Sequence, residues 1–179
     1  GEVASTGTSQ KAEDYGVTSG WGMFRARGEL AALFPAADKR GRFHTAGQSQ
    51  YINNIAAQDQ TQGYCVKKWT NLKDDGEQAS NTADAGVATD FPLMRLADVY
   101  LMFAEATVRD NNVAEWMTAV GLLNDLRGRA FGNSSGQIAA NNLTLDFIIK
   151  ERARELYWEG YRRTDLVRFG LFTSADYLW

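Results

Sequence analysis

The sequence predicts an all-α protein: a helical hairpin plus a further helix, preceded by a loop-rich, irregular first half. Two observations carry this prediction. Residues 1–89 are rich in Gly, Ser, Thr, Gln and Asn with weak apolar periodicity, whereas residues 90–179 repeat apolar side chains at helical spacing. The 179 residues are 44% hydrophobic, which suits one domain, or a fragment of one, with a real core.

The loop-rich segment offers few candidates for regular structure. Residues 23–34 carry apolar side chains at near-helical spacing, and we expect a helix there that Pro35 stops. Residues 64–69 follow Gly63 and contain strand-forming side chains, so we expect a short extended segment. Residues 71–90 contain no aromatic side chain but several Asp, Asn and Gly residues, which predicts a long exposed loop.

The second segment opens with two predicted helices. The first starts at Pro92, because proline suits a first helical turn, and carries an apolar stripe over residues 91–108. The second covers residues 113–130 and ends in a Gly- and Ser-rich stretch. Small residues such as Ala104 and Gly121 allow two antiparallel helices to approach closely. This hairpin resembles a single tetratricopeptide-type unit.

A third helix is predicted after Asn142. Thr144 is a suitable N-cap for it, and Asp146 is favourably placed in the first turn. Gly160 is a suitable left-handed C-cap, so we expect an exit turn after it. Residues 151–170, the end of this helix and its turn, are dense in charged side chains.

The charges of this block follow a helical pattern. Glu151, Glu155 and Glu159 recur every four residues and therefore line one helix face, where they repel unless cations lie opposite. We interpret the block as an ion-pair lattice that pins the helix to its exit turn. Its members are Glu151, Arg152, Glu155, Glu159, Arg162, Asp165 and Arg168. Two alternatives stay open: a hard-metal site, and a hydrolase that uses Glu151, Glu155 or Asp165.

Composition excludes several classes of function. The chain has 19 basic and 22 acidic residues and no basic stripe, so no nucleic-acid partner is expected. A single cysteine, Cys65, excludes an internal disulfide and a cysteine-based zinc site, and a single histidine, His44, weakens triad chemistry. No apolar stretch approaches the roughly 20 residues that span a bilayer, and the first residues lack the pattern of a signal peptide.

Three blocks of sequence occur in a characteristic order. They are 91–106 (FPLMRLADVYLMFAEA), 123–130 (LNDLRGRA) and 143–170 (LTLDFIIKERARELYWEGYRRTDLVRFG). Weaker motifs precede them, among them Gly20-Trp21-Gly22, Asp38-Lys39-Arg40 and Lys67-Lys68-Trp69. In order and approximate spacing these blocks resemble the C-terminal part of the SusD/RagB family, and the resemblance covers residues 20–179.

The resemblance implies an α-rich lipoprotein on the cell-surface face of a Bacteroidetes-type outer membrane, built on tetratricopeptide-like helix pairs. Such a protein captures an oligosaccharide or other nutrient for polysaccharide utilisation and delivers it to a SusC-like TonB-dependent β-barrel transporter. It is a binding protein, not an enzyme. Membrane association would require a lipid anchor that is absent from this chain, since Cys65 lies in its interior, so we expect a C-terminal fragment of a longer protein. The alternative is a tetratricopeptide-type protein-interaction module without sugar binding.

Sugar binding needs flat aromatic faces for the apolar side of a pyranose ring, and planar amide, carboxylate or guanidinium groups for its hydroxyls. Loops held by a rigid scaffold favour such sites, which points to the first half of the chain. The candidate glycan-binding residues are Trp21, Arg27, Tyr51, Tyr64, Trp69 and Asn71. Trp69 is more simply a core residue of the extended segment. We expect no cofactor; the Asp and Asn residues of 71–90 leave a bound calcium ion open as an alternative that no further pattern in the sequence supports.

Overall fold

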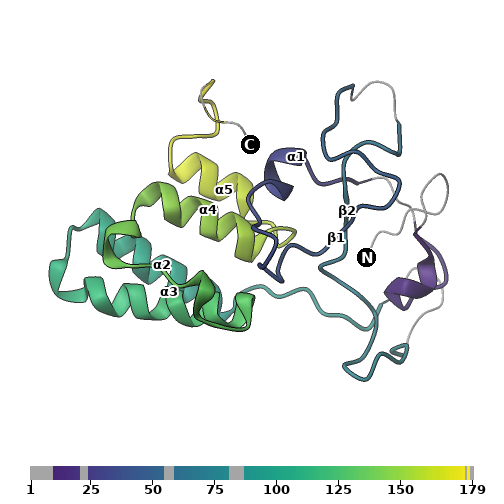
Figure 1. The fold of residues 1–179 in the computed structure, drawn as a ribbon, viewed down its shortest axis with the longest axis horizontal. Helices are drawn as coiled ribbons and strands as arrows, with labels where there is room; N and C mark the ends of the chain where they lie inside the picture. Colours follow the sequence, from purple (N-terminus) through teal and green to yellow (C-terminus); the bar gives the residue numbers. More distant parts are fainter. Residues whose placement is uncertain (1–9, 21–23, 55–58, 81–86, 176, 178–179) are drawn as a thin grey trace. The chain divides into compact units, whose positions relative to one another are not determined.

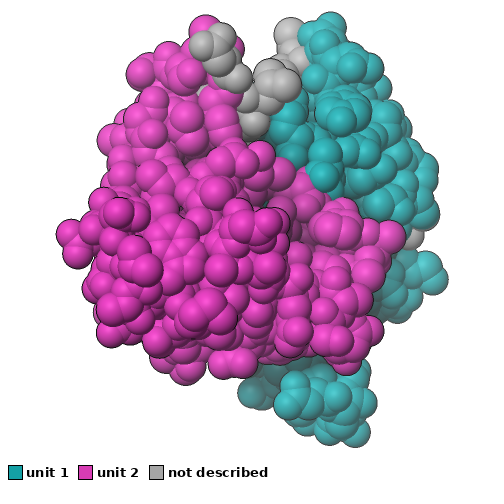
Figure 2. Space-filling view, turned by 60° about the vertical axis from the view of Figure 1, so that its left-hand side comes forward, with its two compact units in different colours: residues 1–32, 42–91, 179 teal, residues 33–41, 92–178 magenta. Residues whose placement is uncertain are grey.

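The structure of this chain is a computed structural model that describes residues 10–20, 24–54, 59–80, 87–175 and 177. The described chain is mostly helical, which confirms the predicted fold class (Figure 1). It divides into two compact units, coloured separately in Figure 2. Unit 1 consists of residues 1–32, 42–91 and 179, and unit 2 of residues 33–41 and 92–178. The boundary between the units at residues 91 and 92 lies close to the composition change near residue 90. The sequence did not predict that segment 33–41 belongs to the helical unit.

Unit 1 contains few regular elements, and all of them are short. Ala12–Tyr15 form one 3-10 turn (η1) and Gly28–Ala31 form one turn of α-helix (α1). Strand β1 (Phe43–His44) pairs antiparallel with β2 (Cys65–Val66). The predicted extended segment at 64–69 therefore contains a real strand.

The predicted helix over residues 23–34 is wrong. Within the described part of this range, only Gly28–Ala31 is α-helical. The backbone before it is held in another pairing: the N–H of Ala26 donates to the carbonyl of Tyr64 at 2.8 Å, as in an antiparallel bridge. A helix cannot extend through a residue whose N–H is bonded to a distant segment.

Unit 2 consists of four α-helices joined by short turns. They are α2 (Leu96–Arg109), α3 (Trp116–Phe131), α4 (Leu145–Leu156) and α5 (Arg162–Arg168). Between them lie 3-10 turns at Val113–Glu115, Ser134–Gly136 and Ala140–Asn142. Helices α2 and α3 form the predicted hairpin, and α4 packs against α2 (Figure 1). The apolar core includes Ala97, Leu101, Ala104, Ala119, Val120, Leu123, Leu126, Leu143, Ile148 and Leu156.

Helix α4 begins as predicted, because the Thr144 hydroxyl accepts a hydrogen bond from the N–H of Phe147 at 3.1 Å. Its end differs from the prediction. The backbone leaves the helix at Tyr157 (ψ 145°), and Trp158 takes a left-handed conformation (φ 63°), so the helix stops before Gly160. The expected exit turn contains another helix, α5.

Helix α2 begins at Leu96, four residues after the predicted start at Pro92. Arg95 is extended (φ −147°, ψ 158°), so it cannot be part of the helix. Its guanidinium pairs with Glu155 of α4 at 2.6 Å and with Glu159, just beyond the end of α4, at 2.8 Å. The start of α2 is thus set by a side-chain contact with a later helix. No helix in the described parts of the chain is long and apolar enough to cross a membrane.

Segment 33–41 is fixed to the helices of unit 2 by hydrogen bonds from both sides. The N–H of Lys39 donates to the carbonyl of Ala130 at 2.9 Å. The Tyr157 hydroxyl donates to the carbonyl of Arg40 at 2.6 Å, and Arg154 Nη1 donates to the carbonyl of Leu33 at 3.1 Å. These bonds place the side chain of Arg40 beside α4.

Candidate functional site

Three of the predicted ligand-binding residues lie on neighbouring segments of unit 1. Tyr64 pairs through its backbone with Ala26, the residue before Arg27. The ring of Tyr51 lies against Gly28, the residue after Arg27: a Cβ added at Gly28 would be 2.3 Å from Cδ1 of that ring. Position 28 therefore has to be glycine for the ring to lie there. The fold brings Arg27, Tyr51 and Tyr64 together although they are far apart in sequence.

This part of unit 1 presents an aromatic ring beside a charged pair. Tyr51 is 50% exposed. The side chain of Arg27 is 59% exposed, and its Nε lies 3.3 Å from Oε2 of Glu29. A hydrogen bond from its own backbone, followed by one from Arg27, lowers the pKa of Glu29, so this carboxylate is ionised at neutral pH. We name Arg27, Glu29, Tyr51 and Tyr64 the platform.

The four platform residues do not have equal access to solvent. Tyr64 is only partly exposed, and its ring centroid lies 6.3 Å from that of Phe43, with the rings tilted by 40°. It therefore packs against β1 and supports the platform from within. Tyr51 is the platform ring that a ligand can reach. Glu29 was not predicted, although its position two residues after Arg27 makes it a natural partner for that guanidinium.

Asn71 was predicted to contact ligand, and its burial contradicts this. The residue is 2% exposed. Its Nδ2 donates to the carbonyl of Gly16 at 3.0 Å, and its Oδ1 accepts from the N–H of Ala88 at 2.8 Å. Its own N–H donates to the carbonyl of Tyr15 at 2.7 Å. Asn71 is a buried amide that joins three chain segments, and it has no free face for a sugar.

The two tryptophans of the prediction have different outcomes. Trp69 is half-buried, and the ammonium of Lys68 lies 5.6 Å from its ring centroid. Trp69 is next but one to the buried Asn71. Trp21, the other tryptophan of the sequence prediction, lies outside the described residues.

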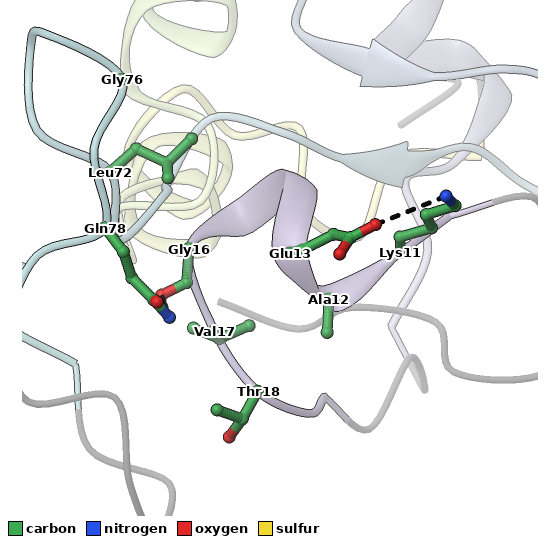
Figure 3. A pocket seen from close by; sticks show the side chains of 9 residues that line it. All are labelled: Lys11, Ala12, Glu13, Gly16, Val17, Thr18, Leu72, Gly76 and Gln78. Atoms are coloured by element: carbon green, nitrogen blue, oxygen red, sulfur yellow. Dashed lines mark hydrogen bonds and ion pairs between the residues drawn. The ribbon is translucent and has the colours of Figure 1, made fainter.

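Unit 1 also contains a pocket with a volume of 680 Å³ (Figure 3). Its lining consists of Lys11, Ala12, Glu13, Gly16, Val17, Thr18, Leu72, Gly76 and Gln78. Lys11 and Glu13 form an exposed ion pair at its rim, and Gln78 donates to the carbonyl of Gly16 at 3.1 Å. None of these described lining residues is aromatic, so the pocket has no ring on which a sugar could stack. The platform is the better candidate.

The three glutamates of the predicted acidic row lie in unit 2 and pair with arginines. Only Glu151 and Glu155 are on α4, because the helix ends at Leu156 and Glu159 follows it. Glu151 is completely buried and pairs with three of them. The distances are 2.8 Å to Arg40 Nη1, 2.6 Å to Arg127 Nη1 and 2.7 Å to Arg154 Nη2. These cations come from segment 33–41, from α3 and from α4 itself. We name the acidic row and its arginines the α4 lattice.

Glu155 and Glu159 complete the row in the same way. Glu155 pairs with Arg40 at 2.9 Å, with Arg95 at 2.6 Å and with Arg129 at 2.5 Å. Arg95 also contacts Glu159 at 2.8 Å, so this one guanidinium bridges two carboxylates. The lattice therefore joins segment 33–41, the N-terminus of α2, α3 and α4.

A second group of ion pairs joins α2, α4 and α5. Arg152 is buried and lies 2.8 Å from both Asp98 and Asp165. Arg168 lies 2.8 Å from Asp165 and also pairs with Glu105. The Arg152–Asp165 pair therefore joins α4 to α5, the helix that follows it, as the sequence interpretation proposed.

Arg162 differs from the interpretation. In the described chain it makes no ion pair; it donates to the carbonyl of Ile149 at 3.4 Å and to the hydroxyl of Tyr177 at 2.8 Å. The cations opposite the acidic row come instead from earlier parts of the chain, above all Arg40, which sequence reasoning did not assign to the lattice. The available signal was Asp38-Lys39-Arg40, an acid and two bases in a polar segment.

The electrostatics of the α4 lattice are those of structural ion pairs. Burial raises the pKa of Glu155, but hydrogen bonds from Arg95 and Arg40 outweigh this effect and lower the pKa from 4.5 to about 2. A glycosidase general acid needs a raised pKa and access to substrate. Glu155 has neither. In the described residues there is also no group of three or more His, Cys, Asp or Glu side chains arranged to hold a metal ion.

Comparisons with known proteins agree on one family. Residues 35–178 match the SusD family. The starch-binding protein SusD of Bacteroides thetaiotaomicron is 38% identical over 157 residues, which are 88% of this chain and 25% of that protein. A SusD-like protein of Formosa agariphila is 31% identical over 160 residues, which are 88% of this chain and 28% of that protein. This chain spans about a quarter of the length of these relatives.

A solved structure supports the fold independently. Surface glycan-binding protein A from Bacteroides fluxus superimposes with a TM-score of 0.56 at 22% sequence identity. The matched region covers 89% of this chain and 34% of that one. At this identity the similarity describes the fold alone.

Proposed function

Because this chain belongs to the SusD family, we propose that it is part of a non-enzymatic protein that binds a glycan. One observation carries the proposal: the 38% identity, over 88% of the chain, with a relative named as a starch-binding protein. Oligosaccharides of glucose are therefore the first ligands to test.

The platform is the place in this chain that best suits a sugar. The half-exposed ring of Tyr51 offers an apolar surface to the C–H side of a pyranose ring. The guanidinium of Arg27 donates hydrogen bonds and the carboxylate of Glu29 accepts them, so both kinds of hydroxyl contact are provided. Gly28 keeps these groups close, because a larger residue would displace the ring.

The family resemblance also supports a partner and a location. We propose that the complete protein lies on the outer face of the outer membrane, held by a lipid anchor, and delivers oligosaccharide to a SusC-like TonB-dependent transporter. Co-purification of a β-barrel transporter with the complete protein, extracted from its native membranes, tests this part. Recovery of a soluble protein partner without a barrel would favour the tetratricopeptide-type interaction module instead.

A binding role without hydrolysis fits the state of the carboxylates. The acidic row is buried and bonded to arginines, and the low pKa of Glu155 keeps it ionised. On the platform, the pKa of Glu29 is lowered as well, so neither group carries a proton to give to a leaving oxygen at neutral pH.

The direct experiment is affinity electrophoresis of the complete protein in gels that contain starch or other polysaccharides. We expect retention, and we expect Tyr51→Ala and Arg27→Ala to weaken it about tenfold, which is about 1.4 kcal/mol. Phe91→Ala is the matched control, because Phe91 is an exposed aromatic outside the platform. A folded wild-type protein that no polysaccharide retains would refute the proposed function. Retention that Tyr51→Ala leaves unchanged would refute only the platform.

A further inference from the structure

The segment that carries Tyr51 lies outside any helix or strand, although its half-exposed ring is part of the platform. One side of this segment is tied to residue 61, because the N–H of Ser49 donates to the carbonyl of Thr61 at 2.8 Å. The hydroxyl of Ser49 also donates to the carbonyl of Tyr51 at 3.1 Å. Neither bond connects the segment to Arg27 and Glu29, the charged pair of the platform.

Gln50 makes that connection. Its Nε2 donates to the carbonyl of Gly28 at 3.0 Å, across 22 positions of sequence. Gly28 lies between Arg27 and Glu29 in the chain, and its carbonyl also accepts the N–H of Ala32 at 2.9 Å, at the end of α1. The Gln50 side chain is half-buried. This one bond therefore joins the segment of the ring to the turn that carries both charged groups.

The orientation of the Tyr51 ring depends on the same neighbour. A tyrosine side chain rotates about two torsions, so a half-exposed ring keeps one orientation only where its surroundings hold it. The ring lies so close to Gly28 that a Cβ at position 28 would be 2.3 Å from Cδ1. The bond from Gln50, the residue next to Tyr51, keeps the two segments at this separation. The ring is thereby covered on the side of Gly28, and a sugar has to use the part that remains exposed.

We propose that Gln50 is a positioning residue of the platform: its amide holds the ring of Tyr51 beside Arg27 and Glu29, so that one sugar unit touches the ring and the charged pair together. The inference deepens the proposed function and rests on it. Without the bond, binding has to order the ring and its segment first, which costs conformational entropy. Affinity then falls although every group that contacts the sugar is still present.

The variant that tests this role is Gln50→Met, because methionine has nearly the size of glutamine but no N–H to donate. In affinity electrophoresis of the complete protein, in gels that contain starch or whichever polysaccharide retains the wild type, we expect retention to weaken at least about threefold. Gln78→Met is the matched control, since Gln78 donates to the carbonyl of Gly16 at 3.1 Å, outside the platform. We expect this control to be retained like the wild type. Equal losses in the two variants overturn the proposal.

A double-mutant cycle separates positioning from a merely structural role. If Gln50 acts through the ring, Gln50→Met has no further effect on retention once Tyr51→Ala is present. A merely structural residue would lower retention by the same factor in both backgrounds, and that result overturns the proposal. Gly28→Ala displaces the ring by another route, because the added methyl group occupies the place of the ring. It should weaken retention in the wild-type background and have no further effect beside Tyr51→Ala.

The outcomes distinguish this role from the proposed function itself. Retention that falls with Tyr51→Ala but not with Gln50→Met overturns the role of Gln50 and leaves the platform in place. A folded wild-type protein that no polysaccharide retains refutes the proposed function, and the role of Gln50 falls with it.

Discussion

The two units of this molecule bury polar side chains by different means. In unit 2, buried carboxylates are matched by arginines from other elements, as where Arg40 pairs with both Glu151 and Glu155. In unit 1, buried amides satisfy backbone groups of neighbouring loops, as Asn71 does. Buried ion pairs therefore stabilise the helical unit, whereas hydrogen bonds from side-chain amides to the backbone stabilise the loop-rich unit. Each unit should therefore respond to a different kind of perturbation.

The largest effect is expected from Glu155→Gln. Glutamine keeps the size of the side chain but removes one ionised partner from both Arg40 and Arg95, so the buried positive charge of the lattice is only partly balanced. Removing one partner of a buried pair costs about 3–5 kcal/mol. Urea unfolding, followed by circular dichroism at 222 nm, measures this loss.

The control for this variant is Glu77→Gln. Glu77 pairs with Lys73 at 3.1 Å on the surface of unit 1, with both side chains largely exposed. Such a pair contributes at most about 1 kcal/mol. If the two variants lose equal stability, the claim that buried charge holds unit 2 fails.

Acid should weaken unit 2 with a defined sign. The pKa of Glu155 is lower in the folded protein, at about 2, than its ordinary value of 4.5. The unfolded chain therefore binds the proton first, and the stabilisation present above pH 4.5 is lost as the pH falls toward 2. The loss is on the order of 3 kcal/mol for this group. Urea unfolding between pH 7 and pH 2 measures it, and Glu155→Gln should show a shallower slope than wild type. Parallel slopes would assign the acid sensitivity to other groups.

In unit 1 the informative variant is Asn71→Ala. It removes the acceptor for the N–H of Ala88 and one of the two donors to the carbonyl of Gly16, which still accepts from Gln78, so we expect a loss of about 1 kcal/mol. Hydrogen exchange should show faster exchange of amides in unit 1 and little change in α2–α4. Asn53→Ala, at an exposed position, is the matched control. Loss of protection spread equally over both units would show that they do not respond separately.

The smallest stability effect is expected from Tyr51→Ala. Half of this side chain is exposed, and substitutions on the surface usually change stability by no more than about 0.5 kcal/mol. Thermal unfolding measures this change, while glycan retention should fall. A large loss of stability would make Tyr51 a structural residue of unit 1 and remove the reason to place the ligand there.

The sequence predicted those parts of the fold that depend on neighbouring residues. The α2–α3 hairpin follows from apolar spacing, and the start of α4 follows from Thr144, whose side chain caps the helix three residues on. The failures involve distant partners. The Ala26–Tyr64 bridge replaces most of the predicted first helix, and the contact of Arg95 with α4 delays the start of α2. Local pattern contains no information about such contacts.

The candidate site was less predictable for the same reason. Arg27, Tyr51 and Tyr64 were chosen for their chemistry, and only the fold reveals that they are neighbours. Asn71 has equally suitable chemistry, but its side-chain amide already forms hydrogen bonds with the backbone of Gly16 and Ala88. Residue type indicates which side chains could contact a ligand, but only the structure shows whether such a side chain is accessible.

The position of Arg40 in the sequence affects when unit 2 can fold during synthesis and which fragments of the chain can fold. This side chain leaves the ribosome 115 residues before Glu155, its partner in the lattice. Unit 2 therefore cannot close its lattice until α4 has been made, and closing so long a loop slows folding. A fragment that began at the composition change near residue 90 would contain all four long helices but not Arg40. It would remove one of the three arginine partners of Glu151 and of Glu155, so a stable helical fragment should include residues 33–41.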